Sequence, residues 1–338
     1  MVGVAEMIRR CLKCGFILGT KPGLYEKDGV CGACINLELA RDFDWSARQA
    51  DLENICQGLR RSDTGYDCVI AVSGGKDSIN ITRGLTQKYG LRPLLVTVTD
   101  EFTHTSAGQH NIKNIAEQFG CDHLAWRCEP DTFRQMTRRD FEQELHPLKW
   151  IEEKIYSIPV MIARRFGISA VFFGENSAFQ YGSVDRLDYL HPLSDAMVKI
   201  YYYFAFEMYD ERVGRATARA YGFKDLDDFN EWQRHGHIEN FTQIDSVGYI
   251  VQLWTKYVKF GYQRVSDMAC RFVRAGHLTR GQALQFIHDR DYQLDPAAKR
   301  DFCQAIGIPM THFDYIVARH ANVDLVEQDI NGIWRLKE

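Results

Sequence analysis

The sequence predicts an α/β fold with a doubly wound parallel sheet, preceded by a small cysteine-rich module and followed by a helical region. Three observations support this prediction. Four cysteines lie in two close pairs near the start, short apolar runs alternate with helical patterns in the middle, and helical periodicity continues alone after about residue 180. Strands that alternate with helices are typical of a parallel sheet with helices on both faces. We therefore expect a module at residues 1–40, an α/β domain at 41–180 and a helical region at 181–338.

The N-terminal module carries its cysteines in the spacing of a structural zinc site. Cys11 and Cys14 form one C-x2-C pair, and Cys31 and Cys34 form a second. This doubled spacing is typical of four-thiolate zinc sites, whose closed coordination leaves no position for a substrate. We therefore expect these four residues to bind a Zn²⁺ ion that stabilises the module. The remaining cysteines show no pairing pattern and are expected to be small core residues.

The α/β domain is predicted from a repeated unit of strand and helix. Residues 44–61 predict a helix that links the module to this unit. Three of the following helical patterns end in an aromatic residue and a glycine, which supplies the left-handed cap of a helix. Pro159 predicts a kink or a break in the third of these helices. The aromatic–glycine pairs are Tyr89-Gly90, Phe119-Gly120 and Phe166-Gly167, and the predicted strands are Val69–Val72, Leu94–Val98, His123–Trp126 and Ala170–Phe173.

After about residue 180 the alternation of strands and helices stops. We expect the helical region to pack against the sheet and to contribute to the functional site. Its predicted helices include Met197–Tyr209, Ser246–Phe260, Ser266–Ala275, Arg280–Ile287, Ala297–Ile306 and Met310–Ala318.

The most informative segment of the chain is Ser73-Gly74-Gly75-Lys76-Asp77-Ser78, which follows the first predicted strand and opens a helix. A glycine-rich turn in this position binds anions, because unpaired backbone N–H groups and the helix dipole point to the same place. The hydroxyl groups and the lysine add donors and charge that suit a phosphate. The segment is not a Walker A loop, because an aspartate follows the lysine where that motif has serine or threonine.

Composition excludes several other classes of function. The 41 lysines and arginines and the 45 acidic residues leave a net charge of −4, and aromatic residues make up 12% of the chain. These values describe a folded protein without the general basic field that nucleic-acid or anionic-membrane binding requires. The start of the chain shows no secretory signal, and no apolar stretch approaches the length that spans a bilayer. We expect a cytoplasmic protein with reduced thiols and no stable membrane insertion.

The segment from Ser73 to Ser78 resembles the PP-loop, SGGxDS, of ATP pyrophosphatases of the HUP type, such as GMP synthetase and NAD synthetase. A more specific resemblance, to the N-acetyl sugar amidotransferase family, spans nearly the whole chain. This resemblance implies the ATP-dependent synthetase subunit of surface-polysaccharide and O-antigen biosynthesis, which converts an N-acetyl group of a nucleotide-activated sugar into an acetamidino group. The segments that carry it are Asp28–Cys31, Tyr66–Cys68, Phe173–Asn176, Gln243–Ser246, Lys259–Gly261 and Leu278–Arg280.

The resemblance implies roles for individual residues. Lys76 would stabilise charge on the phosphates, and Asp77 and Glu175 would hold Mg²⁺, a hard ion that prefers carboxylates and phosphate oxygens. Arg264 is expected to bind an anionic group of the substrate, because its planar guanidinium suits phosphate or carboxylate. The implied catalytic residues are Lys76 and Asp77, the ATP-binding residues are Ser73, Gly74, Gly75, Lys76, Asp77, Ser78, Val98 and Glu175, and the substrate-binding residues are Asn176, Asp245, Arg264 and Asp267.

The polar segment Asp100–His110 follows the second predicted strand and is open to two interpretations, a substrate-binding loop or a solvated surface loop. The chain lacks a Gly-x-Cys-x-Gly nucleophile elbow with downstream His and Glu. We therefore expect a class I glutaminase partner to supply ammonia. Two alternatives remain: a tRNA thiolase-like enzyme, disfavoured because Leu148-Lys149-Trp150 stands where a catalytic thiol is expected, and a zinc-dependent interaction protein that senses ATP.

Overall fold

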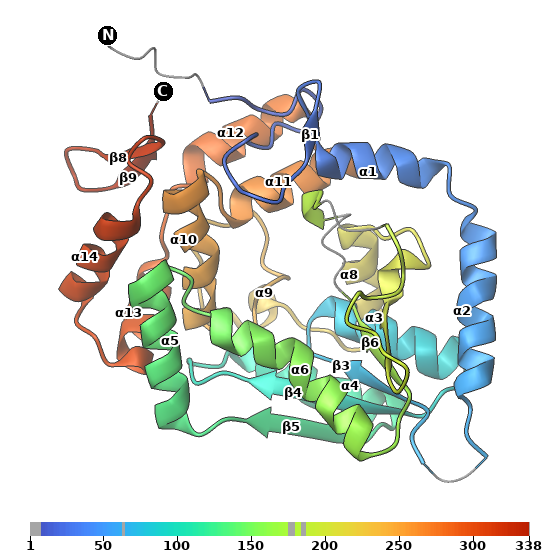
Figure 1. Ribbon diagram of the computed structural model, residues 1–338. Helices are drawn as coiled ribbons and strands as arrows, with labels where there is room; N and C mark the ends of the chain where they lie inside the picture. Colours follow the sequence, from blue (N-terminus) through green and yellow to red (C-terminus); the bar gives the residue numbers. More distant parts are fainter. Residues whose placement is uncertain (1–7, 63–64, 175–179, 184–186, 338) are drawn as a thin grey trace.

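The computed structural model describes residues 8–62, 65–174, 180–183 and 187–337 (Figure 1). Glu175, a predicted magnesium and ATP ligand, and Asn176, a predicted substrate-binding residue, lie outside these ranges, so their roles remain predictions.

The N-terminal module contains a short hairpin and one helix, and a second helix links it to the sheet. Strands β1 (Glu26–Lys27) and β2 (Val30–Cys31) pair antiparallel, and α1 (Gly32–Arg41) follows directly. The predicted linking helix is α2 (Trp45–Leu59), which begins where the Asp44 carboxylate accepts a hydrogen bond from the backbone N–H of Ala47 at 2.9 Å. An acidic N-cap of this kind satisfies a backbone donor that the first helical turn leaves unpaired.

The central sheet confirms the predicted doubly wound architecture. Within the described residues it has five strands in the order β5-β4-β3-β6-β7, and all neighbouring pairs are parallel. The chain moves outward from the central strand through two neighbours and then returns to the other side. A switch point of this kind opens a crevice at the carboxyl ends of the strands. The strands are β3 (Cys68–Ala71), β4 (Pro93–Thr99), β5 (His123–Arg127), β6 (Ala170–Phe173) and β7 (Lys199–Tyr202).

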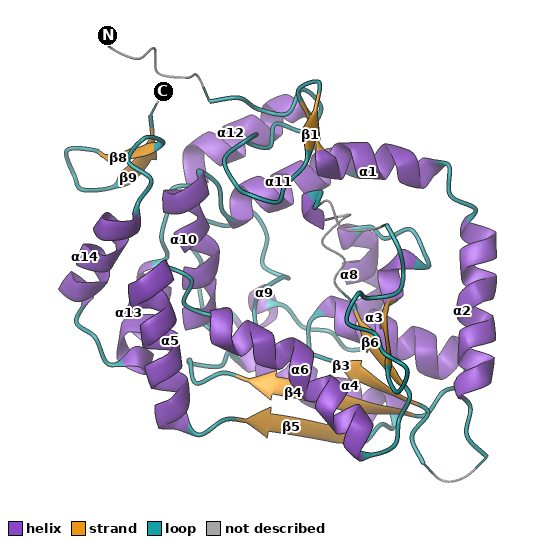
Figure 2. Ribbon diagram, viewed as in Figure 1, coloured by secondary structure: helices purple, strands orange, loops and turns teal. Residues whose placement is uncertain are grey.

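Helices cover both faces of the sheet (Figure 2). Ile70 and Phe172 pack with α3 (Lys76–Arg83) and α4 (Ser106–Phe119) on one face. Val69 and Val171 point the other way and pack against α6 (Lys149–Arg165). This alternation follows from the two-residue period of a strand, and the runs are apolar throughout because both faces are buried. Helix α5 (Pro130–Glu144) lies at the edge of the sheet and packs against the C-terminal helices.

The predicted helix at Met197–Tyr209 is wrong. This segment contains strand β7 and a 3-10 turn at Tyr203–Ala205, and β7 lies past residue 180, where only helices were expected. Ile200 pairs with Val171, and Tyr202 pairs with Phe173, so the segment extends the sheet beyond β6. A short run of apolar and aromatic residues has no period that separates a buried strand from a buried helix.

The predicted helix caps are confirmed. Gly90, Gly120 and Gly167 all have left-handed φ angles, of 64°, 61° and 66°. Pro159 lies inside α6, which runs unbroken from Lys149 to Arg165, so the predicted break does not occur. Helix α3 continues as a π-helical turn at Gly84–Lys88, at a position where Tyr203 packs against Gly84.

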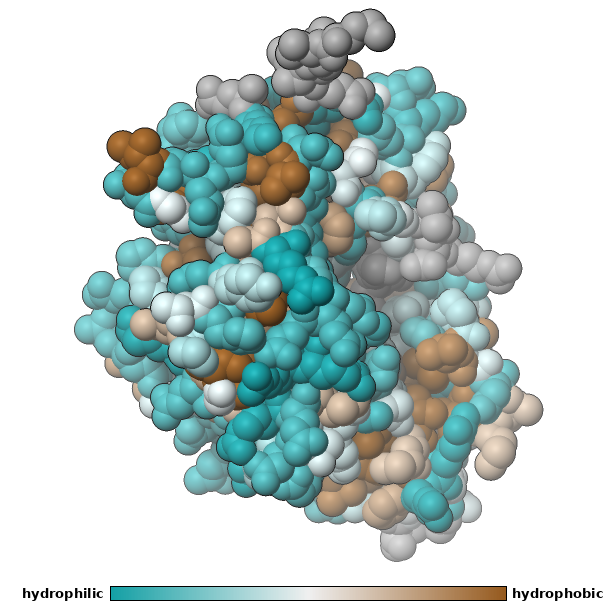
Figure 3. All heavy atoms as spheres, turned by 60° about the vertical axis from the view of Figure 1, so that its left-hand side comes forward, coloured by the Kyte–Doolittle hydropathy of each residue, from teal (hydrophilic) through white to brown (hydrophobic). Residues whose placement is uncertain are grey.

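The C-terminal region is mostly helical, as predicted, and its helices wrap from the sheet to the N-terminal module (Figure 1). No helix among the described residues has both the length and the apolar character to cross a bilayer. The face shown in Figure 3 is largely hydrophilic with scattered apolar patches. The elements are α8 (Glu211–Ala220), α9 (Leu226–Phe229), a 3-10 turn at Gly248–Ile250, α10 (Val251–Phe260), α11 (Arg264–Arg274), α12 (Arg280–Arg290), α13 (Pro296–Ile306), α14 (Met310–His320) and a hairpin of β8 (Val326–Gln328) and β9 (Trp334–Leu336), which was not predicted.

Candidate functional site

The predicted phosphate loop lies between the carboxyl end of β3 and the start of α3. Gly74 has a φ angle of +83°, and a Cβ atom there would lie 2.9 Å from the side chain of Ile112, so only glycine fits. The backbone N–H of Ser73 donates to the Ser78 hydroxyl at 3.0 Å, which closes the loop on itself. Gly75 caps α3 without a side-chain acceptor, so the first N–H groups of the helix remain available to an anion.

Lys76 is almost fully buried, and its ammonium group lies between two carboxylates. Its Nζ atom is 2.8 Å from Oδ2 of Asp77 and 2.6 Å from Oε2 of Glu211. The Tyr209 hydroxyl donates to the same Asp77 carboxylate. Burial lowers the pKa of Lys76, but the two carboxylates outweigh burial and raise it above its usual value. The lysine is therefore held as a fixed cation behind the phosphate loop.

The ion pair of Lys76 continues into the C-terminal helices as a chain of alternating charges. Nη1 of Arg271 lies 2.8 Å from Oε1 of Glu211, and Nε of Arg271 lies 2.9 Å from Oδ1 of Asp267. Asp267 in turn accepts from Nη1 of Arg264 at 2.8 Å. We call this set, from Asp77 through Lys76, Glu211, Arg271 and Asp267 to Arg264, the ion-pair chain. A buried chain of this kind persists only when every charge has a partner.

The described residues that were predicted to bind substrate lie in two separate parts of the structure. Arg264 and Asp267 are brought together in the ion-pair chain, where Arg264 also donates to the Thr242 hydroxyl at 2.6 Å. Asp245 instead lies beside Asp100 at the carboxyl end of β4. Burial raises the pKa of Asp245 first, and the neighbouring charge of Asp100 raises it further, to about 7. Two carboxylates this close do not both ionise readily.

The segment Asp100–His110 is only partly a loop. Its second half forms the first turns of α4, and its first half pairs with residues 244–247, through a bridge between His104 and Ser246. The Ser246 hydroxyl donates to Oδ2 of Asp100 at 2.7 Å. Val98, which the resemblance implies as an ATP-binding residue, lies just before this segment, among the half-buried last residues of β4.

We expect Asp245→Asn to change how stability depends on pH. The raised pKa means that the fold favours the protonated acid, so the free energy of unfolding should fall as pH rises from about 4 to about 7 and stay lower above. Asparagine resembles the neutral acid and should raise stability at pH 8 by about 1–2 kcal/mol. Urea unfolding at a series of pH values tests this. The exposed Asp324→Asn is the control, and parallel curves for wild type and Asp245→Asn would contradict the account.

The four predicted zinc ligands converge in the N-terminal module. Their sulfur atoms all lie within 4.8 Å of one another, and all four side chains are buried. The Cys11–Cys34 and Cys14–Cys31 sulfur pairs are 3.9 Å and 3.6 Å apart. A zinc ion with Zn–S bonds of about 2.3 Å requires tetrahedral edges of about 3.8 Å, whereas a disulfide requires about 2.05 Å. The geometry therefore fits a Zn²⁺ ion held by four thiolates.

The N-terminal module is fastened both to the helical region and to the segment after β6. Its cysteines share an apolar core with α11 and α12, where Phe16 packs edge-on against Tyr262 at 4.7 Å. Leu24 forms an antiparallel bridge with Ser183, and the backbone N–H of Tyr25 donates to the carbonyl of Gly182 at 3.1 Å. The module therefore lies next to the segment around Gly182 that follows β6.

We expect Gly182→Ala to loosen this docking. A Cβ atom at Gly182 would lie 2.1 Å from the backbone nitrogen of Ala33, and the φ angle of +72° already disfavours other residues. The clash with backbone should cost about 3 kcal/mol or more, measured by thermal unfolding. Gly23→Ala is the matched control: its φ of +81° is similar, but no atom lies within 4 Å. It should cost only about 1–2 kcal/mol, and equal losses for the two variants would argue against the close approach.

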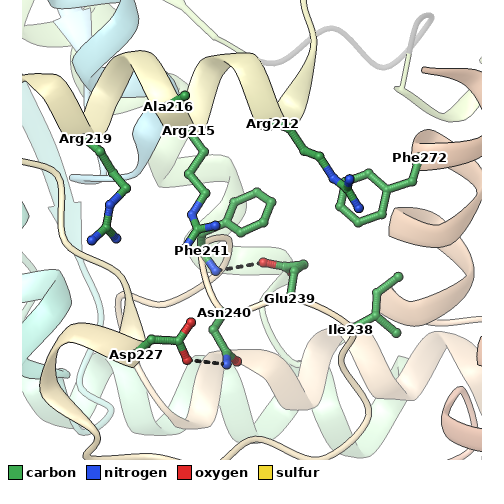
Figure 4. Close-up of a pocket in the computed structure, with 10 residues that line it drawn as sticks. All are labelled: Arg212, Arg215, Ala216, Arg219, Asp227, Ile238, Glu239, Asn240, Phe241 and Phe272. Atoms are coloured by element: carbon green, nitrogen blue, oxygen red, sulfur yellow. Dashed lines mark hydrogen bonds between the residues drawn. The ribbon is translucent and has the colours of Figure 1, made fainter. Parts of the chain in front are cut away.

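A cavity of about 550 Å³ lies beside the ion-pair chain, against α8 (Figure 4). Arg212 stacks over Phe272 at 4.8 Å, and Arg215 stacks over Phe241 at 5.0 Å. Arg219, on the same helical face, is paired with Asp228. Of the residues predicted to bind ATP or substrate, none of those that the structure describes lines this cavity.

Sequence reasoning missed Glu211, Arg271 and Tyr209 as members of the site, and also Tyr181, whose ring centre lies 5.2 Å from the Arg271 guanidinium group. Glu211 lies far from Lys76 in sequence and carries no motif, and Tyr181 lies just past the predicted end of the α/β domain. The one available signal is that Glu211 stands in the first turn of an amphipathic helix, where an acid also complements the helix dipole.

Comparison with known proteins gives one family match. Residues 231–337 match the family described as LPS biosynthesis protein WbpG-like, C-terminal domain. This range contains the part of the ion-pair chain formed by Arg264, Asp267 and Arg271. The phosphate loop and the matched domain are therefore linked through Glu211, which pairs with both Lys76 and Arg271.

Other similarities are more distant. Uncharacterized protein MJ1599 of Methanocaldococcus jannaschii is 29% identical over 98 residues, which are 29% of this chain and 35% of that protein. NMN synthetase from Francisella tularensis is similar over 79% of this chain and 94% of its own, with 12% identity and a TM-score of 0.38. The NH3-dependent NAD synthetase from Campylobacter jejuni is similar over 40% of this chain and 58% of its own, with 12% identity and a TM-score of 0.31.

Proposed function

We propose that the chain belongs to the N-acetyl sugar amidotransferase family and is an ATP-dependent synthetase that converts the N-acetyl group of a nucleotide-activated sugar into an acetamidino group. Its product would enter surface-polysaccharide biosynthesis, in keeping with the LPS biosynthesis family that residues 231–337 match. The observation that carries the proposal is the position of Glu211, whose carboxylate binds Lys76 of the phosphate loop and also Arg271 of the matched domain.

The proposed reaction has two steps. In the first, the N-acetyl carbonyl oxygen attacks the α-phosphorus of ATP, the bond between the α-phosphate and the pyrophosphate breaks, and pyrophosphate leaves. In the second, ammonia adds to the imidate carbon, and AMP leaves with the former carbonyl oxygen. An amide is a poor electrophile, so the first step supplies the leaving group that the second step needs.

The residues of the loop suit the first step. The free N–H groups at the start of α3 and the fixed charge of Lys76 would hold the β- and γ-phosphates and stabilise the departing pyrophosphate. Because Lys76 is held by Asp77 and Glu211 before any ligand binds, no reorganisation is needed when negative charge develops.

Asp77 fits the role of a magnesium ligand. Its carboxylate is 41% exposed at the start of α3, so it can bind Lys76 and still reach a metal ion. When bound, Mg²⁺ would neutralise charge on the phosphates of ATP. Glu175 remains the proposed second ligand, outside the described residues.

Ammonia is proposed to come from a separate class I glutaminase. The purified chain should use free ammonium, and glutamine should replace ammonium only when the partner is added. The partner proposal fails if the two purified proteins form no complex by light scattering and give no glutamine-dependent product.

A direct assay separates the proposal from its alternatives. The protein is incubated with ATP, Mg²⁺, ammonium and a panel of UDP- and CMP-linked N-acetyl sugars, and products are identified by mass spectrometry. We expect AMP, pyrophosphate and a sugar with one oxygen replaced by NH. An ATP sensor would release no AMP, and a tRNA thiolase would show RNA-dependent turnover instead; either result would overturn the proposal.

A further inference from the structure

Three lysines from two separate elements come together at the edge of the site. Lys21 belongs to the N-terminal module, and Lys256 and Lys259 belong to α10, one helical turn apart. We call Lys21, Lys256 and Lys259 the lysine cluster. All three side chains are half-buried, so they are accessible to a ligand while partly removed from water.

Tyr181 lies at the centre of this arrangement. The Lys21 ammonium group lies 6.0 Å from the centre of its ring, and the Lys256 ammonium group lies 5.8 Å from it. The guanidinium group of Arg271 lies 5.2 Å from the same ring. Arg271 is the member of the ion-pair chain that holds Glu211 and, through it, Lys76. The lysine cluster is therefore separated from the phosphate loop by a few contacting side chains.

Burial and the neighbouring positive charges of the lysine cluster together lower the pKa values of Lys21 and Lys259. Burial lowers the pKa of Lys259, and the neighbouring Lys256 and Lys21 lower it further, to about 8. Burial also lowers the pKa of Lys21, again with a contribution from Lys256. Holding several cations close together and partly away from water costs free energy. A bound anion would reduce that cost.

Among the described residues, the acidic groups that act on Lys21 and Lys259 each have another partner. Glu152, which acts on both Lys21 and Lys259, lies 3.1 Å from Nε2 of His146. Glu144, which acts on Lys259, is bonded to Lys149 at 2.5 Å. Asp267, which acts on Lys21, is bonded to both Arg264 and Arg271. Each of these carboxylates is therefore shared between the lysines and another hydrogen-bonding partner.

We propose that the lysine cluster binds the phosphate or diphosphate group of the nucleotide-activated sugar, with Tyr181 and Arg271 between that group and the ATP loop. This inference rests on the proposed function and extends it by naming the substrate site. It also gives the zinc module a direct role: the module carries Lys21, and its contacts with Gly182 hold that lysine beside Tyr181.

Calorimetric titration of the full chain with UDP, CMP, inorganic pyrophosphate and Mg-ATP tests the proposal. We expect Lys21→Gln and Lys256→Gln each to weaken UDP binding about tenfold, the size of one lost charge-assisted contact, without a matching loss of Mg-ATP affinity. Lys21→Arg, which keeps the charge, should retain most of the affinity. The control is Lys113→Gln, which removes an exposed charge on α4 and should leave UDP binding unaffected.

Three results would overturn the proposal. One is the absence of UDP and CMP binding to the wild-type chain. Another is equal weakening by Lys113→Gln, which would indicate a general charge effect. The third is a loss confined to pyrophosphate and Mg-ATP, which would assign the cluster to the phosphates of ATP. Failure of the proposed function gives a different pattern: UDP binding that depends on the cluster, but no AMP formed with any sugar.

Discussion

Lys76→Met should lower the rate of ATP-dependent AMP formation by about 10²- to 10³-fold. The ammonium group of Lys76 is the fixed cation behind the phosphate loop, and removal of one preorganised charge-stabilising donor typically lowers turnover about 10²- to 10³-fold. The same change should lower stability by about 3 kcal/mol, because Asp77 and Glu211 would then face each other without the cation between them. AMP release and urea unfolding measure the two effects.

A double variant separates the loss of chemistry from the loss of stability. In Lys76→Met/Glu211→Gln, one positive and one negative charge are removed together, so most of the lost stability should return. Turnover should not return, because the cation that faces the phosphates is still missing. A Lys76→Met protein that forms AMP within a few-fold of the wild-type rate would contradict the assigned role, and recovery of turnover in the double variant would show that Lys76 acts only structurally.

Cys14→Ser should release the zinc ion and unfold the N-terminal module. The binding free energy of a structural zinc site is about 10–16 kcal/mol, and in a small module it is the main source of folding free energy. Metal analysis of the wild type should give one zinc per chain, and the variant should give none. Because Lys21 lies on the module, the variant should also lose affinity for UDP, as should wild-type protein stripped of zinc by a chelator.

Cys270 offers a matched control for this result. Its side chain is buried in the same core, and its sulfur donates to the Cys14 carbonyl at 3.3 Å, but it is not one of the four grouped ligands. Cys270→Ala should therefore keep the full zinc content. Zinc retained by Cys14→Ser, or lost from Cys270→Ala, would contradict the ligand assignment.

Most of the fold was predictable because its signals are local. The two C-x2-C pairs, the glycine-rich loop and the aromatic–glycine caps each occupy a few neighbouring residues. The structure groups the four cysteines, places the loop between β3 and α3, and gives the three cap glycines left-handed φ angles. Strand β7 was not predictable in this way. Its run of isoleucine and tyrosine suits a buried strand or a buried helix equally, and only pairing with β6 decides between them.

The candidate site was predictable only where a motif marks it. Lys76 and Asp77 were found from the loop, whereas Glu211 and Arg271 come from distant segments that meet only in the folded chain. The environment of Arg264 was equally hidden: its sequence context suggests an anion-binding residue, but the structure surrounds it with Asp267 and Thr242. Such pairings depend on how the helical region docks, which local patterns do not encode.

Transfer of the N-acetyl oxygen tests the central claim most directly. A nucleotide-linked sugar that carries a heavy-oxygen label in its N-acetyl carbonyl is turned over with ATP, Mg²⁺ and ammonium, and the AMP is analysed by mass spectrometry. If the chain adenylates that carbonyl, the label should appear in the phosphate of AMP, in an amount equal to the acetamidino sugar formed. AMP without the label, or ADP and phosphate in its place, would contradict the account.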